Sequence, residues 1–175
     1  MKSSVALIGF MGTGKTAAGR VLAARLGREF VELDALIELR AGKRIPDIFR
    51  DAGETAFREL EIAAVKEAAG RKRAVIACGG GIVLNRINID RLSQECVIVC
   101  LTASPAAILE RTAGDHNRPL LDAADRLSRI TGMLKQRRPY YEQAAEVTVN
   151  TTRLTVDEVV DEVVRRLKEH DSFDF

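Results

Sequence analysis

The sequence predicts an α/β protein of three layers, in which helices cover both faces of a parallel β-sheet. Short apolar runs alternate along the chain with longer stretches whose apolar residues recur at helical spacing. A run that is apolar throughout is typical of a strand buried on both faces. Strands separated by helices form right-handed βαβ units, and the strands are therefore expected to run parallel.

Five runs are predicted as strands: residues 5–9, 30–34, 74–78, 96–101 and 146–150. The connecting segments carry helix signals, which include an apolar face over residues 55–69 and an apolar stripe over residues 156–167. The last five residues, DSFDF, are expected to fray. At 175 residues, the chain is long enough for one domain with a real core.

Three of the predicted helices have recognisable ends. Gly27 is a natural C-cap for the first helix. Ser104 followed by proline is typical of a helix N-terminus. Thr155 with Glu158 forms a capping box for the last helix.

Composition narrows the class of protein. The chain has 27 Lys and Arg against 25 Asp and Glu, a net charge of +2, which argues against a nucleic-acid-binding surface. No apolar run reaches the roughly 18 residues of a membrane helix. The N-terminus leads directly into the first strand, which argues against a signal peptide. We expect a cytoplasmic monomer without nucleic-acid or membrane partners.

The three cysteines are Cys78, Cys96 and Cys100, and they form no C-x-x-C pair. All three fall in or beside predicted strands. Buried, reduced thiols are therefore expected rather than a metal cluster.

The stretch GFMGTGKT, residues 9–16, matches the pattern G-x-x-x-x-G-K-[ST] between a predicted strand and a predicted helix. Its glycines permit a tight turn whose N–H groups point inward, at the positive end of the helix dipole. Lys15 can contact the β and γ phosphates, and the Thr16 hydroxyl can ligate Mg²⁺. The loop predicts binding of ATP or GTP.

Two further unusual stretches fall at strand ends, where ligands collect in such sheets. Glu32 and Asp34 end the second strand, and alternation along a strand would place both on one face. One could hold Mg²⁺ through water while the other accepts a hydrogen bond or proton from a substrate hydroxyl. Alternatively, Asp34 only caps the next helix. The run Gly79–Gly81 is conformationally costly, which favours a ligand against the backbone over a plain loop.

Three arginines have both structural and functional interpretations. Arg58 could pair with a neighbouring glutamate on its helix, and Arg137 could favour the C-terminal end of a helix dipole. Arg118 lies in a polar, turn-rich segment that could close over a site.

These stretches together resemble bacterial shikimate kinase. The resemblance rests on GFMGTGKT, Asp34, FRELE at 57–61, CGGGIV at 78–83, RPLL at 118–121 and RRPYYEQAA at 137–145. It implies a P-loop kinase fold with a five-stranded parallel sheet in a single domain, 1–175. It also implies a substrate-binding helical segment at about 33–61 and a lid at about 113–125.

The resemblance implies transfer of the ATP γ-phosphoryl group to the 3-hydroxyl of shikimate, with Mg²⁺, in the biosynthesis of chorismate and the aromatic amino acids. The catalytic residues it implies are Lys15, Asp34 and Arg118. The ATP-binding set is Gly12, Thr13, Gly14, Lys15, Thr16, Ala17, Arg111, Arg118 and Arg153. The substrate-binding set is Asp34, Arg58, Gly79, Gly80, Gly81 and Arg137.

The sequence departs from the family at one position, because Glu32 stands where the family usually has aspartate. Glutamate can still reach a metal-bound water, although it is one methylene longer. Two alternatives remain open. One is a kinase of another small hydroxylated acid such as gluconate, or of a nucleoside monophosphate. The other is a non-catalytic ligand sensor on the same fold.

Overall fold

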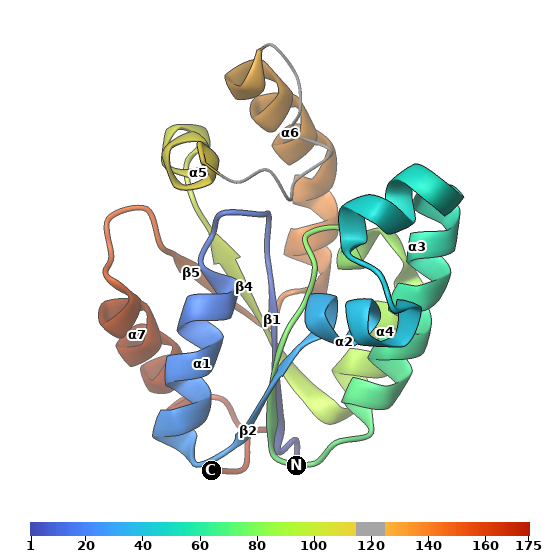
Figure 1. Cartoon of the computed structure of the whole chain (residues 1–175). Coiled ribbons are helices and arrows are strands. Elements are labelled where there is room, and N and C mark those ends of the chain that lie inside the picture. Colours follow the sequence, from blue (N-terminus) through green and yellow to red (C-terminus); the bar gives the residue numbers. More distant parts are fainter. Residues whose placement is uncertain (115–124) are drawn as a thin grey trace.

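The computed structural model of the chain describes residues 1–114 and 125–175. Five parallel strands form one sheet in the order β2-β3-β1-β4-β5 (Figure 1). This architecture confirms the predicted fold class. The strands are β1 (Ser4–Ile8), β2 (Glu29–Glu32), β3 (Ala74–Ala77), β4 (Cys96–Thr102) and β5 (Val147–Asn150).

Helices cover both faces of the sheet. The first five helical elements are α1 (Lys15–Leu26), α2 (Leu33–Ala41), α3 (Ile45–Ala69), the short 3₁₀ turn η1 (Ile82–Leu84) and α4 (Arg86–Glu95). The others are α5 (Pro105–Thr112), α6 (Arg126–Ala144) and α7 (Val156–Lys168). Figure 1 shows α1 and α7 on one face and α2, α3 and α4 on the other, while α5 and α6 extend beyond the carboxyl edge of the sheet.

The central strand β1 divides the core into two parts. Val5 and Leu7 pack with Leu22 in the layer formed by α1 and α7. Ala6 and Ile8 point to the other face, where α2, α3, α4 and α6 contribute the apolar side chains. Burial on both faces therefore accounts for the apolar run from Val5 to Ile8.

The predicted helix ends are present. Gly27 ends α1 in the left-handed conformation, with φ of 60°. The Ser104 side chain accepts a hydrogen bond from Ala107 N at the start of α5. Thr155 and Glu158 form both hydrogen bonds of the capping box that begins α7.

The predicted extent of the second strand is wrong. β2 ends at Glu32, and Asp34 lies in the first turn of α2. The alternation of strand side chains therefore does not relate the two carboxylates. Asp34 is not the cap of this helix either, because Glu32 occupies the N-cap position and makes no side-chain capping bond.

The helix predicted over residues 55–69 begins earlier, at Ile45. Gly53, with φ of 83° and ψ of 175°, interrupts α3, so that two helical segments meet there at a kink. A conformation with positive φ suits glycine, and Gly53 allows the chain to turn between the two segments.

The C-terminal segment is docked rather than frayed. Lys2 N donates to Ser172 O (2.6 Å), and Asp174 N donates to Lys2 O (3.0 Å). The Phe173 side chain is only 7% exposed, and the Arg28 guanidinium lies 4.4 Å from the centre of its ring. Burial of one aromatic ring beside the amino end of β1 outweighs the polar character of the tail.

The three cysteines are buried free thiols, as predicted. Burial raises the pKa of Cys96 to about 12 and that of Cys100 to about 11. No helix within the described ranges is long and apolar enough to cross a bilayer. The cytoplasmic location and the monomeric state stay predictions.

Candidate active site

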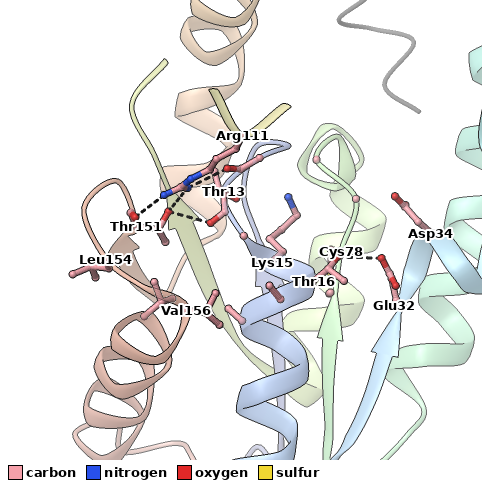
Figure 2. A pocket seen from close by; sticks show the side chains of 18 of the residues that line it. Thr13, Lys15, Thr16, Glu32, Asp34, Cys78, Arg111, Thr151, Leu154 and Val156 are labelled. Atoms are coloured by element: carbon pink, nitrogen blue, oxygen red, sulfur yellow. Dashed lines mark hydrogen bonds between the residues drawn. The ribbon is translucent and has the colours of Figure 1, made fainter. Parts of the chain in front are cut away.

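The carboxyl ends of β1, β2 and β3 open into a cavity of about 500 Å³ (Figure 2). Residues 12–18 form its floor, and residues 77–80 lie beside them. Glu32 and Asp34 lie on one side of the cavity, and Arg111 and Thr151 lie on the other, with Lys15 between them. Three of the sequence stretches singled out above therefore meet at one place.

The loop between β1 and α1 is shaped to receive an anion. Gly14, with φ of 94°, occupies the N-cap position of α1 without a side-chain cap, and the first turn holds no acidic residue. The first N–H groups of the helix are therefore available to a ligand. Gly12 has φ of 77°, and a Cβ atom there would lie 2.9 Å from Thr112 Cγ2. A side chain at this position would strain the loop.

Lys15 is held at the mouth of this loop. Its Nζ donates hydrogen bonds to Gly9 O (2.8 Å) and Phe10 O (2.9 Å). The loop is stiffened by Thr13, whose hydroxyl also donates to Phe10 O (2.7 Å). The ammonium charge consequently lies close to the open N–H groups at the start of α1, where phosphate oxygens would bind.

Thr16 and Glu32 place side-chain oxygen atoms, which are possible metal ligands, beside the phosphate loop. The Thr16 hydroxyl donates to Glu32 Oε1 (3.0 Å), and Arg20 Nη2 lies 3.5 Å from Glu32 Oε2. A hydroxyl and a carboxylate next to a phosphate site are the hard ligands that Mg²⁺ prefers, with phosphate oxygens and water completing its shell. The pair therefore fits a magnesium ion.

Arg111 joins the phosphate loop to the start of the β5–α7 connection. Its Nη1 donates to Gly12 O (3.1 Å) and Thr151 Oγ1 (3.0 Å), and its Nη2 donates to Thr151 O (2.8 Å). The Thr151 hydroxyl donates in turn to Thr13 O (3.0 Å). Thr151 is a site residue that the sequence motifs do not predict; its signal in the sequence is its place just after the last strand.

The predicted ATP-side residues do not all lie together. Ala17 lines the cavity, whereas Arg153 is exposed and is not among its lining residues. Leu154, Thr155 and Val156 line the wall near Arg111 instead. The apolar atoms of this wall suit the flat face of a base.

On the acceptor side, Gly79 lies between two carboxylates. A Cβ atom on Gly79 would be 3.2 Å from Asp34 Oδ1 and 3.2 Å from Glu61 Oε2. Asp34 comes from α2 and Glu61 from α3, so the glycine lets two acidic side chains approach the end of β3. The close approach that the three glycines predicted is therefore made by charged side chains.

Two arginines approach the next two glycines. A Cβ atom on Gly80 would lie 3.7 Å from Arg137 Nη1, and one on Gly81 would lie 2.7 Å from Arg58 Nη1. Arg137 is 7% exposed, and its Nη1 has no hydrogen-bond partner among the described residues. A buried guanidinium with an unused N–H group is well suited to bind an anionic ligand.

Arg58 makes the helical ion pairs that its sequence allowed. Its Nη1 donates to Glu61 Oε1 (3.1 Å), and its Nη2 donates to Glu54 Oε1 (3.2 Å). These pairs hold the guanidinium against Gly81. The structural and the functional interpretations of Arg58 are therefore compatible.

Glu61 is a second residue of the site that was not among the predicted site residues. Its side chain is 1% exposed, and burial raises the pKa of the carboxyl to about 6, against the opposing charges of Arg58 and Arg137. The nearby Asp34 adds to the rise. The sequence does carry a signal, because Glu61 lies four residues after Phe57 and three before Ala64, on the apolar face of α3.

The predicted lid and Arg118 lie outside the described residues, in the gap 115–124. The described segments on either side of this gap are joined through Arg126. Its Nη2 donates to Thr112 O (2.7 Å), which joins the start of α6 to the end of α5.

In this parallel α/β fold, the phosphate-binding loop opens into a cavity that also has charged side chains on its wall. A fold and a site of this kind define a P-loop phosphotransferase. The chain belongs to the shikimate kinase family, because the sequence model described as shikimate kinase matches residues 11–168. This confirms the resemblance found in the sequence.

Relatives and solved structures agree. The chain is 43% identical to the shikimate kinase of Symbiobacterium thermophilum over 95% of this chain and 97% of that protein. It is 44% identical to that of Pelotomaculum thermopropionicum, over 95% and 96%. The structure of shikimate kinase from Acinetobacter baumannii in complex with shikimate is similar at a TM-score of 0.94 and 34% identity, covering 98% and 96% of the two chains.

Proposed function

We propose that this protein transfers the γ-phosphoryl group of ATP to the 3-hydroxyl of shikimate, giving shikimate 3-phosphate. The observation that carries the proposal is the set of four charged side chains around residues 79–81, which we call the glycine turn; the four are Asp34, Arg58, Glu61 and Arg137. Two are guanidinium groups and two are carboxylates; of these, Asp34 lines the cavity that contains the phosphate loop, and the other three lie against the adjoining glycines. Shikimate has one carboxylate and three hydroxyls, which this arrangement complements.

On the nucleotide side, the N–H groups at the start of α1 and the Lys15 ammonium would bind the phosphates of ATP. The wall formed by residues 154–156, together with Arg111, would contact the base. Bound Mg²⁺, held by Thr16 and through water by Glu32, would neutralise charge on the phosphate oxygens. Arg118 would contact the transferring phosphoryl group, as the resemblance implies.

On the acceptor side, Arg58 and Arg137 would bind the carboxylate of shikimate, and Asp34 would bind its ring hydroxyls. Asp34 would orient the acceptor hydroxyl and accept its proton as the new bond forms. The N–H groups of the glycine turn would lie against the substrate. We also propose that residues 33–61, which include α2 and the kink at Gly53, form the substrate-binding segment of a single domain.

Catalysis in this proposal rests on positioning and on neutralisation of charge. The cavity receives the triphosphate from the β1–α1 loop and the acceptor from the glycine turn. Both ligands would meet beside Lys15 and Asp34. The distance between the reacting atoms would then depend on the rigid carboxyl ends of β1 and β3.

The test is release of ADP from Mg-ATP with shikimate, gluconate or AMP as acceptor. We expect strong stimulation by shikimate alone. Stimulation by gluconate or AMP instead would reassign the acceptor, and nucleotide binding without turnover on any acceptor would favour a ligand sensor.

Asp34→Asn tests the role of the carboxylate. We expect turnover to fall at least about a hundredfold, because general-base assistance typically contributes that much or more. ATP affinity, measured by calorimetry, should change by less than about threefold. Asp51→Asn, an exposed carboxylate of the same segment, is the matched control. Turnover of Asp34→Asn close to that of the control would remove Asp34 from the proposed role.

A further inference from the structure

The glycine turn is tied to α6 by a hydrogen bond that the proposed mechanism does not use. The Tyr141 hydroxyl donates to the carbonyl oxygen of Gly80, which is 61 residues away in the sequence. The Tyr141 side chain is buried, with the residue 6% exposed, whereas the adjacent Tyr140 is 48% exposed. The two tyrosines therefore have different environments although they are neighbours.

This hydrogen bond sets the orientation of a peptide group in the substrate cavity. The chain has no cis peptide bond among its described residues. In a planar trans peptide, the N–H of Gly81 points away from the carbonyl of Gly80. Holding that carbonyl on Tyr141 therefore holds the Gly81 N–H on the opposite side of the turn. Because glycine has little intrinsic preference between backbone conformations, the hydrogen bond from Tyr141 restricts this peptide group more than it would restrict one between bulkier residues.

The N–H groups of the turn are available to a ligand. The hydrogen bonds within the described residues include none donated by the N–H of Gly80 or Gly81. Buried or half-buried peptide N–H groups normally find an acceptor. Gly80 lines the cavity, and a substrate carboxylate would provide such an acceptor.

The same face of α6 supplies a second group for the substrate. Arg137 precedes Tyr141 by four residues, which places both side chains on one face of the helix. The Arg137 guanidinium lies beside Gly80 and 5.7 Å from the centre of the Phe10 ring. One helix therefore positions both an arginine and the peptide group next to it.

The Tyr141 phenol is suited to this task because it remains a donor. Burial raises the pKa of Tyr141 to about 12, against the opposing charge of Arg137. The hydroxyl consequently stays protonated throughout the physiological range.

We propose that Tyr141 is a positioning residue for the acceptor: its hydrogen bond to Gly80 orients the glycine turn so that its N–H groups meet the substrate carboxylate beside Arg137. This inference rests on the function proposed above. It adds a residue that touches neither the substrate nor ATP and yet sets the affinity for the acceptor.

The test compares Tyr141→Phe with Tyr140→Phe in the full-length protein. Tyr141→Phe should raise the KM for shikimate about three- to tenfold, the value expected for loss of one neutral hydrogen bond. The KM for ATP should stay within about twofold. Tyr140→Phe should leave both constants within about twofold. A merely structural role would lower the melting temperature and the active fraction but would not raise one KM selectively.

An unchanged KM for shikimate in Tyr141→Phe would overturn the inference, as would an equal rise in both constants. Wild-type protein without shikimate-dependent turnover would overturn the proposed function instead, so the two failures are distinguishable.

A second measurement needs no variant. In wild-type protein, the amide proton resonances of Gly80 and Gly81 should move downfield when shikimate is added, since they would then donate to a carboxylate. The resonance of Gly27, at the end of α1, is the internal reference. Resonances of Gly80 and Gly81 that do not respond to shikimate would overturn the inference even if Tyr141→Phe failed to fold.

Discussion

Replacing the buried carboxylate of Glu61 should remove a specific pH dependence from the stability of the protein. Burial raises the Glu61 pKa from its ordinary 4.5 to about 6. A raised pKa means that the folded state holds this proton more tightly than the unfolded state does. The stabilisation is therefore fully present below pH 4.5 and is lost as the pH rises through about 6.

The magnitude follows from the shift. A difference of roughly 1.5 pKa units corresponds to about 2 kcal/mol of folding free energy. Glu61→Gln keeps the shape of the side chain and cannot titrate. The free energy of unfolding of wild type, measured relative to that of Glu61→Gln, should therefore fall by about 2 kcal/mol between pH 4 and pH 7.

The assay is urea denaturation of wild type and Glu61→Gln at half-unit steps from pH 4 to pH 7.5. Glu59→Gln makes the same chemical change on the exposed face of α3 and is the matched control. A difference between wild type and Glu61→Gln that is flat across this range would refute the reasoning. A difference that grows with pH would mean that the attraction of Arg58 outweighs burial and that the pKa is lowered.

Two further substitutions test other parts of the structure. Gly81→Ala should raise the KM for shikimate about tenfold, because its Cβ would lie 2.7 Å from Arg58 Nη1 and must displace the guanidinium. Gly132→Ala, which has open space around it, is the control, and equal kinetics of the two variants would contradict this interpretation. Phe173→Ala should lower the free energy of unfolding by about 3 kcal/mol and leave kcat unchanged, whereas Phe175→Ala, 49% exposed, should have little effect. Similar thermal stability of these two variants would show that the tail does not stabilise the fold.

The sequence was sufficient for features that depend on local pattern. The five apolar runs, the end of α1 at Gly27 and the capping box of α7 each depend on neighbouring residues. The phosphate loop is equally local, since its motif lies between a strand and a helix. The local pattern therefore predicts each of these features correctly, apart from the carboxyl end of β2.

Features that depend on contacts between distant segments were missed or wrong. In FVELD, the apolar Leu33 continues the alternation of β2, and no local signal places the start of α2 there. The docking of Phe173 against Lys2 and Arg28 depends on residues more than 140 positions away. In the second case, the burial of Phe173 overrides the polarity of its segment.

The positions of the four charged side chains around the glycine turn could be predicted only in part. The three glycines predicted that something approaches the backbone, but not that Asp34, Glu61, Arg58 and Arg137 do so. Glu61 shows the limit most clearly. A carboxylate on the apolar face of α3 is visible in the sequence, whereas its burial against Gly79 is a property of the assembled fold.

The central claim is that this site phosphorylates the 3-hydroxyl of shikimate, and the identity of the product tests it most directly. Wild-type protein is incubated with Mg-ATP and shikimate, and the position of the phosphoryl group is determined by coupled phosphorus and proton NMR. We expect a single phosphate ester on the 3-oxygen. Inorganic phosphate as the only product, or an ester at another hydroxyl, would contradict it.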